Sequence, residues 1–241
     1  MSDRQPQRAP GFAHLVLTCF LPFAAGYLLS YIFRMVNAVV GPRIAAELGL
    51  DLAALGVLTS TYFIGFVLLQ IPAGVMLDRF GPRRVQAVLL LFAALGAGLF
   101  ALSSSLATLG IARAIVGAGV AMCLMAGFKA NTLFWPPERL GTANGVLMAF
   151  AGVGGVFGTL PVTWLADLAG WRGVFWVLAA ASLAISAFVW FAVPDRRAET
   201  QQGLAEAFGG VRRIVTAPVF WRVVPLSATT QAAFQAYHTL W

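Results

Sequence analysis

Long apolar runs follow one another along this chain, and they constrain its fold more than any other feature. A helix needs about 20 predominantly apolar residues to cross the hydrocarbon core of a bilayer. Six runs meet that length, and a seventh begins before the last residue. Because backbone polar groups in lipid must be satisfied within the segment, we expect each run to be a helix. The predicted spans are Phe12–Val40, Ala53–Leu77, Val85–Leu102, Leu106–Trp135, Thr142–Ala166, Val174–Val193 and the start of a last one, Trp221–Trp241.

The charge content supports a lipid environment and excludes other classes of protein. Only 10% of the residues are charged, whereas a soluble domain usually carries about 25%. The net charge of +7 does not indicate nucleic-acid binding, because the basic residues lie in short gaps between apolar runs. Cys19 and Cys123 both lie in apolar runs, without a disulfide framework or metal-ligand spacing. We therefore expect an all-α polytopic membrane protein in a lipid bilayer, with no cofactor.

The apolar runs also divide the chain into parts. We expect a cytoplasmic tail over 1–11, a six-helix transmembrane bundle over 12–193, a central loop over 194–220, and the start of a seventh span over 221–241. The central loop has the pattern of a short amphipathic helix around Leu204–Ile214. The first apolar run is too long for the h-region of a cleavable signal peptide, which is about 7–15 residues. Because the last run is cut off at Trp241, we expect the chain to be incomplete.

The distribution of Lys and Arg predicts the orientation in the membrane. If the N-terminus is cytoplasmic, the cytoplasmic pieces hold 11 of the 16 basic residues, and the outer loops hold only Arg43 and Arg172. Cytoplasmic loops carry the excess of positive charge in membrane proteins. We therefore predict a multi-pass protein of the cell inner membrane with its N-terminus in the cytoplasm. The three remaining cations lie inside apolar runs: Arg34, Arg113 and Lys129.

The loop between the second and third spans carries the most informative motif, which reads GVMLDRFGPRR over residues 74–84. It resembles the signature loop of the major facilitator superfamily, Gly-x-Leu-Ala-Asp-Arg-x-Gly-Arg-Lys. Leu77 and Pro82 depart from that pattern, and the alternative is a generic basic turn. The matching residues are Gly74, Asp78, Arg79, Gly81 and Arg83. We expect Gly74 to permit close helix approach, and we expect Asp78, which ends its helix at the membrane edge, to need a cationic partner. The resemblance implies that Asp78, Arg79 and Arg83 act as a gate latch against the other half of the transporter.

Weaker motifs agree with this resemblance. The fourth span carries Arg113 with Gly117 and Gly119, similar to the Arg-x-x-x-Gly-x-Gly motif of the superfamily. The turn after it contains Pro136 and Pro137, which stop the helix. The fifth span is rich in glycine, for which tight helix packing is the alternative to a functional motif. Its glycines and proline are Gly145, Gly152, Gly154, Gly155, Gly158 and Pro161.

Arg34 is the strongest candidate for substrate binding. A charge at mid-bilayer costs about 2.5–3.5 kcal/mol or more on insertion scales, and Tyr27 and Tyr31 lie on the same helix face. The segment around Arg34 resembles the first helix of the organophosphate:phosphate antiporters and the nitrate transporter-like branch. This resemblance implies that Arg34 binds the anionic group of the substrate. The alternative is snorkelling of Arg34 toward the outer interface.

The other charges inside the spans favour an anionic substrate. Arg113 is a second candidate ligand, or else a structural cation that donates to backbone carbonyls, and Lys129 lies close enough to the inner end of its helix to snorkel. No Asp or Glu lies deep in a full span, which disfavours a carboxylate proton relay in this half. Guanidinium groups recognise phosphate, nitrate or carboxylate through planar, bidentate hydrogen bonds. An organophosphate, nitrate and an organic acid all remain open.

The seventh run adds a polar stripe of three residues: Gln231, Gln235 and His238. Because the first and seventh helices are equivalent in a transporter built from two six-helix halves, the resemblance implies that this stripe lines the central cavity. The alternative is hydrogen bonding between helices. The family would continue with about five further helices, which form the C-terminal half that this chain lacks and that we expect as its partner.

The sequence predicts a secondary active transporter of a small polar solute, expected to be an anion, that works by alternating access. The alternative is a transporter-like membrane sensor that binds its solute without net transport. Nucleophile elbows, clustered metal ligands and phosphate-binding loops are all missing from the sequence. We therefore do not expect an enzyme.

Overall fold

The structure, a computed structural model, describes residues 12–195 and 216–240, and for residues 231, 232 and 234–240 it describes the backbone alone. Within these ranges every regular element is a helix and none is a strand. The predicted tail and the predicted amphipathic segment Leu204–Ile214 lie outside the described residues. The chain separates into two units, 1–199 and 200–241. The first contains nearly all the described residues, and the second contains helix α10 (Pro218–Leu240).

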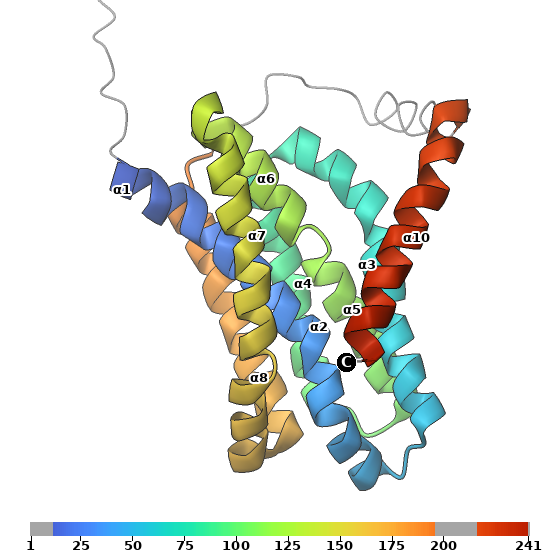
Figure 1. Ribbon diagram of the computed structural model, residues 1–241. Helices are drawn as coiled ribbons and strands as arrows, with labels where there is room; N and C mark the ends of the chain where they lie inside the picture. The colour runs from blue at the N-terminus through green and yellow to red at the C-terminus, as the bar shows by residue number, and fades with distance from the viewer. Residues whose placement is uncertain (1–11, 196–215, 241) are drawn as a thin grey trace, which may run out of the picture. The chain divides into compact units, whose positions relative to one another are not determined.

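The first unit is a bundle of long apolar helices (Figure 1). The N-terminal stretch is continuous from α1 (Phe12–Leu15) through η1 (Val16–Phe20) to α2 (Leu21–Leu48). It passes Pro42, where we predicted an end near Val40, and stops at Gly49, whose φ of 66° is left-handed. Helices α3 (Leu52–Phe80) and α4 (Pro82–Leu102) follow. Asp51 caps α3 by accepting a hydrogen bond from the Ala54 amide at 2.8 Å.

The fourth span is interrupted rather than continuous. Helix α5 (Leu106–Val120) and helix α6 (Cys123–Phe134) are separated by a turn at Ala121 and Met122. The Gln70 amide of α3 donates to the Ala121 carbonyl at 3.4 Å. This bond satisfies a carbonyl near the break, as a membrane interior requires.

The fifth and sixth spans lie in one stretch of 56 residues, Pro137–Ala192, which contains η2 (Pro137–Arg139), α7 (Leu140–Phe157) and α8 (Leu160–Ala192). A straight helix of that length would measure about 84 Å, far more than the roughly 30 Å of a bilayer core. Gly170 breaks α8 with a non-helical φ of 69°, and the chain reverses direction there (Figure 1). We predicted a loop between Ala166 and Val174, and the structure reduces it to this one reversal.

Glycine brings two pairs of helices close together. A Cβ added at Gly117 of α5 would lie 2.0 Å from the Tyr62 carbonyl of α3, and one at Gly154 of α7 would lie 2.7 Å from the Leu28 carbonyl of α2. Tight packing therefore explains these two glycines. With its apolar helices and buried core, the chain has an all-α, multi-pass membrane fold, as predicted.

Candidate functional site

Two arginines from different helices define the candidate site. Arg34 is half-buried on α2, with its guanidinium carbon 4.9 Å from the Tyr31 ring centroid and 5.4 Å from that of Phe66 on α3. Arg113 on α5 is only 1% exposed. Neither arginine forms an ion pair within residues 12–195.

Arg113 is held by backbone and aromatic groups. Its Nη1 donates to the Phe33 carbonyl at 3.3 Å, and its guanidinium lies over the rings of Tyr62 at 4.9 Å and Phe100 at 5.9 Å. These contacts match the alternative of a structural cation better than direct substrate contact. Because Phe33 precedes Arg34 in the chain, Arg113 fixes the backbone next to Arg34.

Tyr62 lies at the centre of this cluster, and the sequence reasoning missed it. Its side chain is 1% exposed, its ring centroid lies 4.9 Å from the Arg113 guanidinium carbon, and its hydroxyl, although near the Arg34 side chain, forms no hydrogen bond of good geometry in the described part of the chain. A tyrosine in an apolar run carries no local signal of such a role. Phe66 and Phe100, whose rings lie against Arg34 and Arg113 respectively, were missed for the same reason.

Hydrogen-bond donors in the cluster lack acceptors. The Nε atoms of Arg34 and Arg113 are buried and have no partner within the described residues, and the Tyr62 hydroxyl shares this state. A buried donor without an acceptor costs about 1–3 kcal/mol. An anion with several oxygen atoms would supply the acceptors that these donors need.

The structure places Tyr27 behind Tyr31. Tyr27 is 6% exposed, and the two rings pack edge to face at 5.3 Å. Tyr31 is thus the tyrosine that lies beside Arg34, and Tyr27 packs against the Tyr31 ring. The side chains of Gln231, Gln235 and His238 lie outside the described residues, so the polar stripe stays a prediction.

The loop between α3 and α4 has an ordered set of polar contacts. Gly81 has a φ of 80°, which a glycine adopts without strain. Asp78 pairs with Lys129 of α6 at 2.9 Å. Arg83 donates to the Trp190 carbonyl at 2.8 Å, and the Arg79 guanidinium lies over the Phe80 ring. The cationic partner that we expected for Asp78 is therefore Lys129.

Two expectations change with this loop. We counted Lys129 among three intramembrane cations without an anion, but its pairing with Asp78 leaves only Arg34 and Arg113 in that class within residues 12–195. We also expected Gly74 to permit close helix approach, but a Cβ there would meet nothing within 4 Å.

A cavity of about 510 Å³ lies elsewhere in the first unit, between the N-terminal stretch and the turn that leads into α7. It does not include the arginine cluster. Its lining residues are Phe12, Val16, Phe20, Trp135, Arg139, Thr142, Ala143 and Val146.

The fold and the arginine cluster together define a multi-pass, all-α membrane protein whose bundle holds two arginines without a carboxylate partner among the described residues. The sequence profile of the Major Facilitator Superfamily matches residues 23–241, and the chain belongs to this superfamily. The predicted superfamily is thus confirmed, and membership agrees with the expectation of a protein that is not an enzyme. The narrower resemblance of the first span to the organophosphate:phosphate antiporters stays a prediction.

Several curated relatives are similar to this chain. The "Probable sulfoacetate transporter SauU" of Cupriavidus necator is 31% identical over 203 residues, which are 81% of this chain and 47% of the relative. The "Hexuronate transporter" of Escherichia coli is 27% identical over 68% of this chain and 37% of its own length. The "Galacturonate transporter" of Dickeya chrysanthemi is 27% identical over 66% of this chain and 46% of its own length. The chain thus spans about half or less of the length of these relatives.

Proposed function

We propose that this chain belongs to a secondary transporter that moves a small organic anion across the inner membrane by alternating access. Its N-terminus and central loop are cytoplasmic in this proposal. The observation that carries it is the Arg34 guanidinium, which lies in an apolar bundle without a carboxylate partner among the described residues. A cation in this setting favours a ligand that brings its own negative charge.

The contacts of the cluster support a proposed role for each side chain. Arg34 contacts the anionic group, Tyr31 forms the adjacent wall at 4.9 Å, and the Tyr62 hydroxyl donates a further hydrogen bond. Arg113 holds the Phe33 carbonyl and keeps the local potential positive. We keep Gln231, Gln235 and His238 of the seventh span as further candidate substrate ligands in this proposal.

The relatives narrow the substrate class. The names of the similar transporters denote sulfoacetate, hexuronate and galacturonate, which are organic acids with carboxylate or sulfonate groups. Among the three classes that the sequence left open, these names favour an organic acid over an organophosphate or nitrate. Planar carboxylates and tetrahedral sulfonates both accept paired hydrogen bonds from one guanidinium.

Uptake into proteoliposomes tests this function. The full-length protein should accumulate labelled sulfoacetate or glucuronate, glycerol phosphate and nitrate should enter more slowly, and glucose should not enter. Tight binding of an organic acid without uptake would instead support the sensor alternative. Uptake of glucose at the rate of the acids would contradict the anion assignment.

A further inference from the structure

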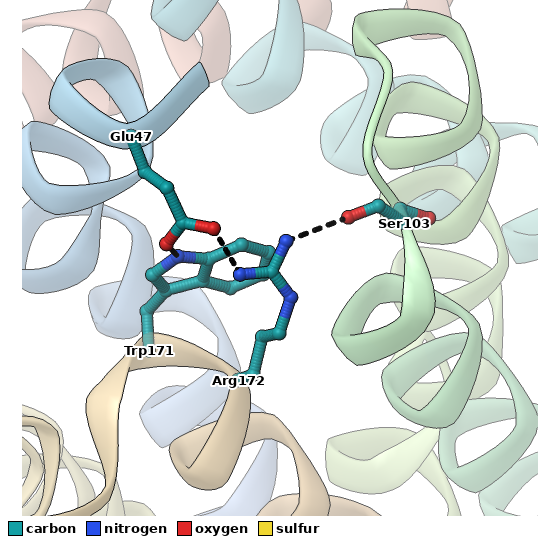
Figure 2. Close-up of polar contacts among 4 residues, drawn as sticks. All are labelled: Glu47, Ser103, Trp171 and Arg172. Atoms are coloured by element: carbon teal, nitrogen blue, oxygen red, sulfur yellow. Dashed lines mark hydrogen bonds and ion pairs between the residues drawn. The ribbon is translucent and has the colours of Figure 1, made fainter.

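A polar cluster joins three helix ends at the Gly170 end of the bundle (Figure 2). Glu47, in the last turn of α2, accepts a hydrogen bond from Trp171 Nε1 at 2.7 Å and forms an ion pair with Arg172. Arg172 also donates to the Ser103 carbonyl at 3.5 Å, where α4 ends. We call these four residues the Glu47 clasp.

The clasp is formed directly at the chain reversal in α8. Trp171 and Arg172 follow Gly170, whose left-handed φ turns the chain back on itself. The Arg172 guanidinium lies 4.1 Å from the Trp171 ring centroid, so Glu47 and the indole ring hold it from two sides. The position of Trp171 is thus set jointly by α2 and by the turn.

An unbroken series of contacts runs from the clasp to the arginine cluster. Trp171 is 3% exposed and packs edge to face on Phe100 at 5.8 Å. Phe100 is fully buried, and its ring centroid lies 5.9 Å from the Arg113 guanidinium carbon. Arg113 in turn donates to the Phe33 carbonyl, the residue before Arg34.

We propose that Glu47 is a positioning residue for anion binding: it orients Trp171, and Trp171 acts through Phe100 to hold Arg113 and the backbone beside Arg34. This inference rests on the proposed function, because it names Arg34 as the group that contacts the anion. A shift of Trp171 can reach Arg113 through Phe100 because the core is closely packed. If the Trp171 indole ring is displaced, Phe100 loses one of its neighbours.

The bundle offers a matched control. Arg43 pairs with Asp167 at 2.6 Å, and this pair also joins α2 to α8, one turn of α2 away from Glu47. Both pairs are partly exposed, with side-chain exposures of 46% for Glu47 and 62% for Asp167. No aromatic contact among the described residues links the Arg43–Asp167 pair to Phe100.

Binding to the full-length protein in detergent, with sulfoacetate and glucuronate as probes, compares the two pairs. Glu47→Ala should weaken binding by about 2- to 30-fold, the range of couplings measured for residues outside a binding site. Asp167→Ala should change it by less than about twofold. Equal weakening by both variants would mean that the Glu47 clasp only stabilises the bundle, and it would overturn the proposal.

A charge swap separates positioning from a simple tie. The double variant Glu47→Arg with Arg172→Glu restores an ion pair between α2 and α8, but it leaves Trp171 Nε1 without its carboxylate acceptor. The swap should recover melting temperature but not affinity, and Trp171→Phe should weaken binding in the same way as the swap. Full recovery of affinity by the swap would contradict positioning through Trp171.

A third experiment measures stability without any ligand. It therefore separates failure of this inference from failure of the proposed function. Melting temperatures of Glu47→Ala and Phe100→Leu should combine non-additively, whereas those of Asp167→Ala and Phe100→Leu should add. Additive effects in both combinations would overturn the connection through Phe100. Non-additivity only with Glu47, together with normal binding by an Arg34 variant, would keep the connection and remove Arg34 as the ligand.

Discussion

The three cations inside the apolar runs, Arg34, Arg113 and Lys129, differ in their partners. Arg113 is enclosed by two aromatic rings and a carbonyl oxygen, so its charge is stabilised within the protein. Arg34 has aromatic neighbours and an Nε without a hydrogen-bond partner in the described part of the chain, and for this reason we propose it, rather than Arg113, as the anion ligand. The same comparison separates Lys129, which pairs with Asp78, from both arginines.

The Asp78–Lys129 pair yields a prediction for the proposed gate. Asp78→Asn in the full-length protein should slow transport and leave insertion intact, because the proposed latch needs the carboxylate charge. The pair itself is largely exposed on the Asp78 side, at 69%, so its loss should cost only about 0–1 kcal/mol of stability.

Lys129→Gln is the control for this prediction, and initial uptake rates are the measurement. If Asp78 latches against the other half, Lys129→Gln should reduce the rate much less than Asp78→Asn. Normal transport by Asp78→Asn would contradict the gate assignment. Equal slowing by both variants would mean that Asp78 acts only through its ion pair with Lys129.

At the level of helices, close packing around the site depends on glycine at particular positions. Gly154 of α7 faces α2 beside the site, where an added Cβ would lie 2.8 Å from the Tyr31 Cβ. The neighbouring Gly155 faces open space, with nothing within 4 Å of an added Cβ. Substituting each of these adjacent glycines therefore distinguishes the effect of close packing from the effect of helix propensity.

We predict that Gly154→Ala lowers the melting temperature of the full-length protein and weakens anion binding, because α7 must move away from α2 and Tyr31. Overpacking of this kind typically costs about 1–3 kcal/mol. Gly155→Ala should be neutral or stabilising by about 0.5–1 kcal/mol, since alanine is favoured in helices. A fully stable Gly154→Ala would contradict the described approach of α7 and α2.

The helices were largely predictable from the sequence, whereas the break inside the fourth span was not. Apolar runs of membrane length mark the spans, because lipid requires them whatever the tertiary contacts are. The break at Ala121 has no proline or charge to signal it, whereas the reversal at Gly170 falls in the gap that was predicted between Ala166 and Val174. The contacts of Glu47 with Trp171 and Tyr62 with Arg113 join residues far apart in sequence, so no local pattern could show them.

For the whole molecule, the topology prediction places the N-terminus and the central loop in the cytoplasm. Single cysteines at Ser2, Ser104 and Thr200, in a background without Cys19 and Cys123, test it with a membrane-impermeant thiol reagent applied to intact cells. Only Ser104→Cys should be labelled from outside. Outside labelling of Thr200→Cys would reverse the assigned orientation.

For the whole protein, the proposed anionic substrate depends on the Arg34 guanidinium, which has no carboxylate partner among the described residues. Arg34→Lys keeps the positive charge but removes the planar pair of donors. If Arg34 only reached the membrane interface, lysine would replace it with little loss, since both stems can snorkel. Arg43→Lys, on the same helix but paired with Asp167, is the matched control.

The most direct measurement is the affinity of the purified full-length protein for sulfoacetate, glucuronate, glycerol phosphate, nitrate and glucose, for the parent and both variants. Arg34→Lys should weaken binding of the preferred anion by about 10- to 150-fold, the equivalent of a charge-assisted hydrogen bond of about 1.5–3 kcal/mol, whereas Arg43→Lys should match the parent. An Arg34→Lys variant that binds this anion as tightly as the parent would contradict the account and return Arg34 to a structural role.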